Sequence, residues 1–273
     1  MDKKTLYVSD LDGTLLRSDE TLSEYTCNVI NNLTEKGMVF SYATARSLIT
    51  AKKATKGLNA NLPLIVYNGA FVMDNQTEEI LISNYFNAKE LDELSRDIFE
   101  AGISPIVYSF IEGVEHFSFI PDKCYERAIS FLDTRKGDKR WREVTDNEQL
   151  LAGNVFYFTC IDLKEKLEPI YEKYKHRYHV VFQQDIYTKD QWLEIMPAEA
   201  SKANAILQLK QLLRCDRVVS FGDASNDIDM FEISDESYAV ANAFEELKMV
   251  ATGVIESNND DGVAKWLEKN IAD

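Results

Sequence analysis

The chain has 273 residues, 45% of them hydrophobic, so one large domain or two moderate domains with substantial cores are expected. Its formal net charge is −16, from 30 Lys and Arg against 46 Asp and Glu. This excess of acidic residues argues against a nucleic-acid partner, which would require clustered basic residues. No apolar stretch approaches the ~20 residues needed to cross a bilayer, so we expect no membrane partner either.

The cysteines and the amino-terminal residues indicate a cytoplasmic protein. The four cysteines are widely spaced and form no CxxC pair, which is typical of reduced, packed thiols. The chain runs from Met1 almost directly into a strand-like segment, so we expect no signal peptide. We predict a cytoplasmic protein that is a monomer or a weak homodimer.

The first part of the chain alternates predicted strands and helices. Apolar runs predict strands over residues 5–9, 38–43 and 63–67, with helices over about 22–36 and from Ser47 onward. Residues 70–83 are typical of a short hairpin. Strands that alternate with helices predict βαβ units and a parallel sheet.

The pattern changes near residue 84. An amphipathic helix is predicted from Ala88 to Gly102. Closely spaced strands and a few helices follow, which predicts a largely antiparallel sheet with helices on one face, an α+β unit. The expected strands are 103–110, 115–120, 154–161, 179–184 and 192–196, and the expected helices are 123–134 and 163–176.

After Pro197 the strand–helix alternation returns and continues to the end of the chain. We therefore predict an α/β fold with a Rossmann-like parallel-sheet core, helices on both faces of that sheet, and an inserted α+β cap domain. The core comprises residues 1–83 and 191–273, and the cap comprises residues 84–190. Two junctions, near 83–87 and 186–191, permit a hinge motion of the insert.

Four polar clusters each follow a strand-like run in the α/β part of the sequence. In an open parallel α/β sheet, ligands bind beyond the carboxyl ends of the strands, so clusters at four such ends should converge in space. One active site is the economical interpretation. The clusters are Asp10-Leu11-Asp12-Gly13-Thr14, Thr44-Ala45-Arg46, Asn68-Gly69 and Gly222-Asp223-Ala224-Ser225-Asn226-Asp227.

The paired carboxylates indicate nucleophilic and metal chemistry. Asp10 and Asp12 could divide the roles of nucleophile and acid/base, although a solvated Asp-Gly turn is the alternative for this segment alone. Asp223 and Asp227 supply hard oxygen ligands that suit Mg²⁺, and helix capping is an alternative role that can coexist with metal binding.

The basic and hydroxyl residues indicate an anion site. Thr44 and Arg46 would offer a hydroxyl, backbone amides and a guanidinium near a helix N-terminus. Helix capping with a solvated arginine is the alternative for that motif. Lys202, at the start of the predicted helix after Pro197, has the alternative of a surface lysine.

Together these motifs resemble those of the haloacid dehalogenase-like (HAD) hydrolases and, more narrowly, their Cof-type phosphatases with a large α/β cap. Ser201-Lys202 and the tail segments Ala241-Asn242-Ala243 and 257–263 fit the same pattern. The resemblance implies that Asp10 is the nucleophile and Asp12 the general acid/base. It also implies that Thr44 hydrogen-bonds the phosphoryl group and that Lys202 stabilises its charge.

The same resemblance implies a metal site and a phosphate site. Mg²⁺ would be held by Asp10, the Asp12 carbonyl and Asp223, with Asp227 and Asn226 in support. The substrate-binding residues would be Thr44, Ala45, Arg46, Asn68, Gly69, Lys202 and Asn226. The chain departs from the family in having alanine at position 45, where the family usually has glycine. It also has Glu199-Ala200 and Ala203 around the Ser-Lys pair, where the family often has glycine.

The expected function is a Mg²⁺-dependent phosphatase that hydrolyses small phosphorylated metabolites, with sugar phosphates the first choice, through an aspartyl-phosphate intermediate. A phosphotransferase or phosphomutase with the same nucleophile is one alternative. A catalytically silent regulator that binds a phosphometabolite is another. Asp10, Asp12, Lys202 and Asp223 argue against the silent regulator, because binding alone needs no nucleophile.

Overall fold

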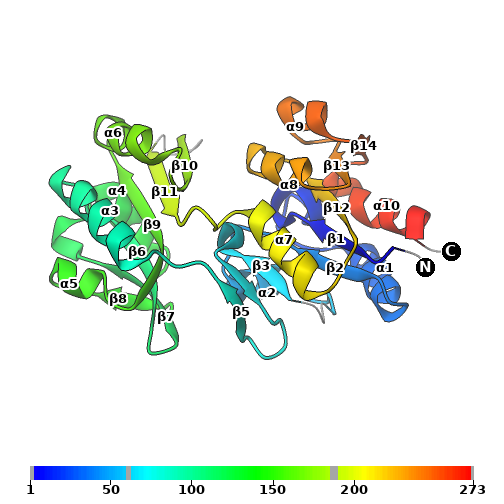
Figure 1. Ribbon diagram of the computed structural model, residues 1–273, viewed down its shortest axis with the longest axis horizontal. Helices are drawn as coiled ribbons and strands as arrows, with labels where there is room; N and C mark the ends of the chain where they lie inside the picture. Colours follow the sequence, from blue (N-terminus) through cyan, green and yellow to red (C-terminus); the bar gives the residue numbers. More distant parts are fainter. Residues whose placement is uncertain (1–2, 60–62, 185–189, 272–273) are drawn as a thin grey trace. The chain divides into compact units, whose positions relative to one another are not determined.

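The computed structural model describes residues 3–59, 63–184 and 190–271. The chain divides into two compact units (Figure 1). The core unit comprises residues 1–83 and 200–273, and the cap unit comprises residues 84–199. This division confirms the predicted fold class, an α/β core with an inserted α+β unit. Within the described ranges, no helix combines the length and apolarity that a membrane span requires.

A five-stranded parallel sheet forms the centre of the core unit, in the order β14-β13-β12-β1-β2. Most residues of its middle strand β12 and of neighbouring β1 are buried, as expected for a sheet covered on both faces. The strands are β1 (Thr5–Ser9), β2 (Val39–Tyr42), β12 (Arg217–Gly222), β13 (Glu236–Val240) and β14 (Gly253–Ile255).

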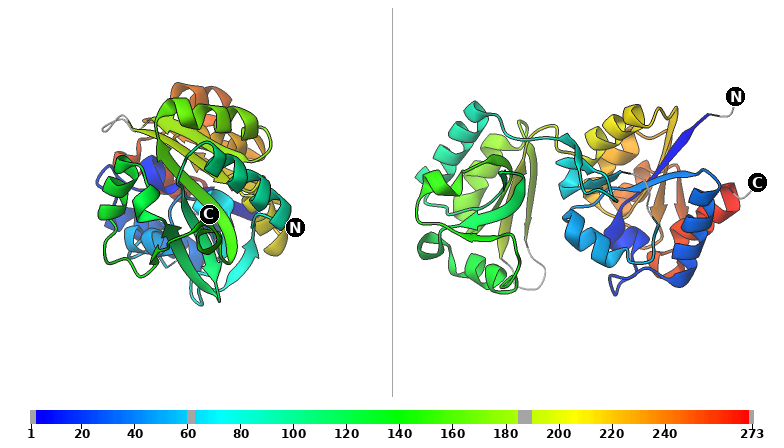
Figure 2. Two further views of the ribbon diagram at one scale, coloured as in Figure 1. Left: turned by 90° about the vertical axis from the view of Figure 1, so that its left-hand side faces the viewer. Right: turned by 90° about the horizontal axis from the view of Figure 1, so that it is seen from below.

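Apart from α2, the helices of the core unit form two groups on opposite sides of this sheet (Figure 2). The first group contains α1 and α10, which pack against each other, and the second contains α7, α8 and α9. A serine caps the N-terminus of several of these helices, and the Ser23 side chain, for example, accepts a hydrogen bond from Thr26 N–H at 2.9 Å. The helices of the core unit are α1 (Glu24–Glu35), α2 (Leu48–Ala54), α7 (Lys202–Leu212), α8 (Ile228–Glu232), α9 (Glu245–Val250) and α10 (Gly262–Ile271).

The segment predicted as a strand over 63–67 forms β3 (Leu64–Val66), which joins a small antiparallel sheet with β4 (Phe71–Met73) and β5 (Ile80–Ser83). A single parallel bridge, Ala43 to Ile65, links it to the end of β2. β3 therefore still runs beside β2, and the polar residues that follow the two strands lie next to each other.

A six-stranded sheet in the order β10-β11-β9-β6-β7-β8 forms the cap unit, and only the β7–β8 pair is parallel. Strand β8 and helix α5 are additions to the predicted elements. The strands are β6 (Ile106–Ile111), β7 (Val114–Phe119), β8 (Trp141–Glu143), β9 (Asn154–Asp162), β10 (His179–Gln184) and β11 (Gln191–Met196). The helices are α3 (Ala88–Glu100), α4 (Glu126–Asp133), α5 (Asn147–Leu150) and α6 (Lys164–Tyr174).

Helices cover both faces of the cap sheet, so the prediction of helices on one face is wrong. Val107 of β6 lies in the core cluster that includes buried residues of α3 and α6. Its neighbour Ile106 lies in a separate cluster with Leu132 of α4. Because successive strand residues point to opposite faces, the two clusters lie on opposite sides. Strand β6 is apolar on both faces, and each face therefore needs a cover.

The second junction between the units also differs from the predicted one. Strand β11 pairs with both β9 and β10, so it is an interior strand of the cap sheet. The cap unit accordingly extends to Glu199, and residues 191–199 do not belong to the core as the predicted segment 191–273 required. Most of the predicted junction 186–191 lies outside the described residues.

Candidate active site

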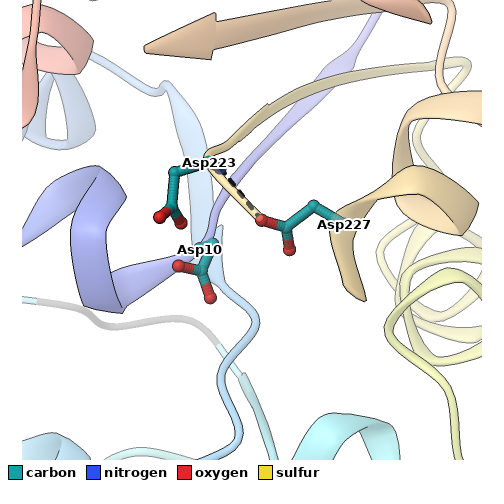
Figure 3. Close-up of side chains that lie close together, drawn as sticks. All are labelled: Asp10, Asp223 and Asp227. Atoms are coloured by element: carbon teal, nitrogen blue, oxygen red, sulfur yellow. Dashed lines mark hydrogen bonds between the residues drawn. The ribbon is translucent and has the colours of Figure 1, made fainter. Parts of the chain in front are cut away.

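Three carboxylates from separate segments meet beyond the carboxyl ends of β1 and β12. Asp10 directly follows β1, Asp223 directly follows β12, and Asp227 closes the 3-10 turn Ser225–Asp227 before α8. One oxygen of each carboxylate lies within 4.8 Å of the others (Figure 3). The backbone N–H of Asp10 also donates to the carbonyl of Phe221 at 2.9 Å, which ties the two strand ends together.

Lys202 is the cation of this group. Its ammonium donates to Asp10 Oδ1 at 2.6 Å and to Asp227 Oδ1 at 2.7 Å. Lys202 is the first residue of α7, and the preceding Ser201 caps that helix through Asn204 N–H. Because the Lys202 side chain is only 2% exposed, the alternative of a surface lysine is wrong.

The loop after β12 is shaped around Asp227. One oxygen of this carboxylate accepts hydrogen bonds from the backbone N–H groups of Asp223 (3.0 Å) and Ala224 (3.2 Å), and the other accepts from Lys202. A side chain at Gly222 would collide with Asp227, so glycine is required at the end of this strand. Both oxygens of Asp227 are thus used to fix the loop and the lysine.

Asp223 is positioned by the loop that follows β1. Its Oδ1 atom accepts a hydrogen bond from the Thr14 hydroxyl at 2.9 Å. Gly13 has a φ of +79°, and a Cβ atom there would collide with the Asp223 carboxylate. Glycine is therefore needed twice over, for its backbone conformation and for this close approach.

The pKa values in this group report crowded negative charge. Burial raises the pKa of Asp10 well above its ordinary value, Lys202 opposes the change, and Asp227 and Asp223 add to it. Burial and the charge of Asp227 raise the pKa of Asp223 to about 6. Burial alone would lower the pKa of Lys202, but its two ion pairs outweigh burial and leave the pKa raised.

This charge balance suits a divalent cation. Three carboxylates share the Lys202 ammonium, and Lys202 and Thr14 each contact only one oxygen of Asp10 and of Asp223, respectively. Carboxylate oxygens are the ligands that Mg²⁺ prefers, commonly one or two per ion. The donor set therefore fits a divalent cation such as Mg²⁺, which Asp10 and Asp223 would hold, with Asp227 in support.

The second and third polar clusters lie side by side. Thr44 is fully buried; its hydroxyl oxygen accepts from Arg46 N–H at 3.1 Å, and its carbonyl accepts from Asn68 N–H at 2.9 Å. Gly69 packs so closely against the Ser201 carbonyl that a side chain there would collide with it. The residues after β2 and β3 are thereby joined to the start of α7, where Lys202 begins.

The Asp12 and Arg46 side chains contact each other, which the sequence did not lead us to expect. The Asp12 side chain is not part of the carboxylate group, because Arg46 holds it in a bidentate ion pair with distances of 2.8 and 2.5 Å. Arg46 also donates to Glu20 at 2.9 Å. The guanidinium thus pairs with two carboxylates. Ala45 and Asn226 are exposed.

Sequence reasoning missed the residues that support the loop after β1. The Asn242 amide donates to the Gly13 carbonyl at 2.7 Å, and its oxygen accepts from Asn258 N–H at 3.0 Å. Asn258 is buried and donates to the Leu16 carbonyl at 2.9 Å. The two asparagines fit the family pattern in the tail, but nothing in that pattern indicates these contacts. No sequence signal pointed to Glu20 either.

The comparisons with known proteins agree with this geometry. The sequence model of the haloacid dehalogenase-like hydrolases matches residues 7–267, and the chain belongs to this family. The resemblance stated from the motifs is therefore confirmed at the level of the family.

Relatives and solved structures match over nearly the whole length. A Haemophilus influenzae protein provisionally named a phosphatase is 29% identical over 271 residues, which cover 96% of this chain and 97% of the relative. A Bacillus subtilis 5-amino-6-(5-phospho-D-ribitylamino)uracil phosphatase is 25% identical over 279 residues, covering 98% of this chain and 97% of the relative. A Thermotoga maritima crystal structure matches with a TM-score of 0.77 and 25% identity over 100% of both chains. A haloacid dehalogenase-like hydrolase from Bacteroides thetaiotaomicron shares the fold, with a TM-score of 0.75 and 21% identity, covering 98% of this chain and 99% of that one.

Proposed function

We propose that this protein is a Mg²⁺-dependent phosphatase that hydrolyses small phosphorylated metabolites through an aspartyl-phosphate on Asp10. The observation that carries the proposal is the buried Asp10–Lys202–Asp227 ion-pair group with Asp223 beside it. An ionised carboxylate next to a buried ammonium is a suitable nucleophile for phosphorus. Membership of the hydrolase family and the phosphatase names of relatives support the same conclusion.

The crowding of charge explains why a cation is needed. Asp10 must be ionised to attack, yet burial and two neighbouring carboxylates raise its pKa and would also repel a phosphate dianion. Lys202 offsets part of this repulsion. When bound between Asp10 and Asp223, Mg²⁺ would supply the remaining positive charge and polarise a phosphoryl oxygen. The family resemblance adds the Asp12 carbonyl as a further ligand.

Two carboxylates would divide the reaction. An Asp10 oxygen bonds to phosphorus while the bond from phosphorus to the leaving oxygen breaks, and Asp12 gives its proton to that oxygen. Asp12 then takes a proton from water as the water oxygen attacks the phosphorus and releases Asp10 and inorganic phosphate. Thr44, Asn68, Gly69 and Lys202, which the fold brings together, would bind the phosphoryl group, with Ala45 and Asn226 at the rim.

The proposed substrates are small phosphorylated metabolites, with sugar phosphates first. One relative is named for a phosphorylated ribitylamino pyrimidine, whose phosphate is carried on a sugar-alcohol chain, and this extends the panel to such compounds. Anionic substrates would reach a protein of net charge −16 only where Lys202 and the cation reverse the potential locally.

The test is turnover of p-nitrophenyl phosphate and of a metabolite panel by the purified protein. We expect activity with Mg²⁺, loss of activity in excess EDTA and recovery when Mg²⁺ is restored. Full activity in EDTA would contradict the metal assignment, because Mg²⁺ held by so few carboxylates exchanges readily. Preference for phosphoproteins over small phosphates would contradict the substrate class.

The alternatives give different products. A phosphotransferase would place the phosphoryl group on an added sugar, and a mutase would move it within the substrate, instead of releasing inorganic phosphate. A silent regulator would bind phosphometabolites in calorimetry without turnover. Measuring free phosphate with and without an acceptor sugar therefore separates the three.

A further inference from the structure

Asp12, Arg46 and Glu20 form a connected pair of salt bridges at the edge of the carboxylate group. Arg46 Nε donates to Asp12 Oδ2 at 2.8 Å, and Arg46 Nη2 donates to Asp12 Oδ1 at 2.5 Å. The same Nη2 atom donates to Glu20 Oε2 at 2.9 Å. Asp12 therefore has both oxygens engaged by one guanidinium, and Glu20 binds the outer side of that guanidinium.

The bidentate contact determines where the Asp12 carboxylate points. A planar guanidinium that donates to both oxygens of a carboxylate holds the two groups in nearly one plane, which a single ammonium contact cannot do. Asp12 is about half exposed and has no other contact that would orient it among the described hydrogen bonds. Arg46 is thus the group that selects one direction for this side chain.

Glu20 is held in place by its own turn. Its N–H donates to the Arg17 carbonyl at 2.9 Å, and the N–H of Arg17 donates to Thr21 at 2.9 Å. Glu20 has a φ of +61°, a left-handed conformation that is unfavourable for a residue with a side chain. The turn keeps this conformation, and the Glu20 carboxylate contacts Arg46.

We infer that Arg46 is a positioning residue that aims Asp12 for proton transfer and that Glu20 holds Arg46 in this role. The inference rests on the proposed function, in which Asp12 is the acid/base. It replaces the expectation that the Arg46 guanidinium binds the phosphate of the substrate. Loss of Arg46 should therefore impair the reaction of leaving groups that need a proton and largely spare the binding of phosphate.

The experiment compares kcat/KM for two substrates in Arg46→Met, Arg46→Lys and Glu20→Gln. p-Nitrophenolate leaves without a proton, whereas the alkoxide of glycerol phosphate requires one. Since kcat/KM reports steps up to loss of the leaving group, the ratio of the two values isolates proton donation. The inhibition constant of inorganic phosphate and the melting temperature are measured alongside.

We expect the ratio, p-nitrophenyl phosphate over glycerol phosphate, to rise about tenfold in Arg46→Met, part of the 10²–10⁴-fold that general acid catalysis contributes. In Arg46→Lys the ratio should rise less, because lysine keeps the positive charge but cannot donate to both oxygens of Asp12 in one plane. In Glu20→Gln the ratio should rise a few-fold. The inhibition constant of phosphate should stay within about twofold in all three variants.

Each other result overturns the inference. Equal losses on both substrates with weaker phosphate inhibition would make Arg46 a phosphate ligand. Equal losses with a lower melting temperature would make it structural. An unchanged ratio, or faster turnover of glycerol phosphate, would show that Arg46 and Glu20 do not orient Asp12 for proton transfer.

Two controls separate this inference from the proposed function. Glu78 matches Glu20, with a φ of +62° and an ion pair to Lys52 at 2.7 Å, so Glu78→Gln should leave the ratio unchanged. Asp12→Asn should raise the ratio most of all. If the wild-type protein has no phosphatase activity, or Asp12→Asn does not raise the ratio, the proposed function fails first. If Asp12→Asn raises the ratio and the Arg46 variants do not, only the inference fails.

Discussion

The core and cap units differ in where the groups that neutralise a buried carboxylate come from in the sequence. In the cap unit, the Asp162 side chain is 5% exposed and accepts hydrogen bonds from near neighbours in sequence, the Leu163 N–H at 2.7 Å and the Lys166 ammonium at 3.2 Å. In the core unit, Asp10 depends on Lys202, which lies 192 positions away, and shares that lysine with Asp227.

The difference supports the proposal that the core unit carries the chemistry. Asp162 in the cap unit is neutralised by groups beside it in the sequence, so its contacts contribute to folding. The core acids are buried together around one ammonium, and burial, with their mutual repulsion added, raises the pKa of Asp10 and of Asp223. Such repulsion costs stability, and perturbed carboxylates of this kind concentrate at functional sites. Variants matched between the two units test this interpretation.

The largest expected effect is on turnover. Asp10→Asn removes the nucleophile and keeps its shape, so kcat should fall by about 10³-fold or more. Asp162→Asn in the cap unit should leave kcat within about twofold, because its contacts are local. Rapid-quench mass spectrometry should find a phosphoryl group on the wild-type protein and none on Asp10→Asn. Finding that group on Asp12 would contradict the assignment.

The second effect is on stability. Lys202→Met leaves buried carboxylates without their cation and should lower the free energy of unfolding by about 3 kcal/mol. Lys166→Met removes a lysine that is 43% exposed and should cost at most about 1 kcal/mol. Urea denaturation in EDTA at pH 7.5 measures both. Equal losses in the two variants would remove the distinction between the units.

The third effect appears in the metal-free protein as a pH dependence. The pKa of Asp223 is raised from 3.8 to about 6 in the folded state, so the folded protein binds more protons than the unfolded one between these values. Stability from this group is present at low pH and is lost as pH rises through about 6.

Asp223→Asn removes that titration. In EDTA the variant should be more stable than the wild type by about 1–2 kcal/mol at pH 7.5, and the difference should shrink towards pH 5. Adding Mg²⁺ should stabilise the wild type and leave the variant nearly unchanged. Superimposable melting temperatures of the two proteins across this pH range would contradict the electrostatic account.

The smallest effect compares two glycines with positive φ. Gly13 in the core unit has φ +79° and meets Asp223, whereas Gly113 in the cap unit has φ +82° and nothing within 4 Å. Alanine should cost about 1 kcal/mol at either position through its backbone alone. Gly13→Ala should cost about 1 kcal/mol more and also lower turnover, because the new methyl group displaces Asp223. Equal melting temperatures for the two variants would show that this close approach is not required.

The sequence predicted most of the core because buried parallel strands are apolar runs bounded by turn residues. It missed β8 and α5, which have three and four residues and are too short to show a period. It also placed the second junction before β11, although that strand alternates buried and half-buried residues and pairs on both sides within the cap sheet. Pairing partners are set by contacts distant in sequence, which a local pattern does not record.

The sequence by itself determined which chemical groups stand at the strand ends: the carboxylates of Asp10 and Asp223, the Thr44 hydroxyl, and the glycines that let loops approach. Only the tertiary structure decided how charged groups are paired. It buried Lys202 between Asp10 and Asp227 and turned Arg46 towards Asp12 and Glu20. The physical reason is that an ion pair depends on distance and burial in three dimensions, and strands far apart in sequence become neighbours only when the sheet forms.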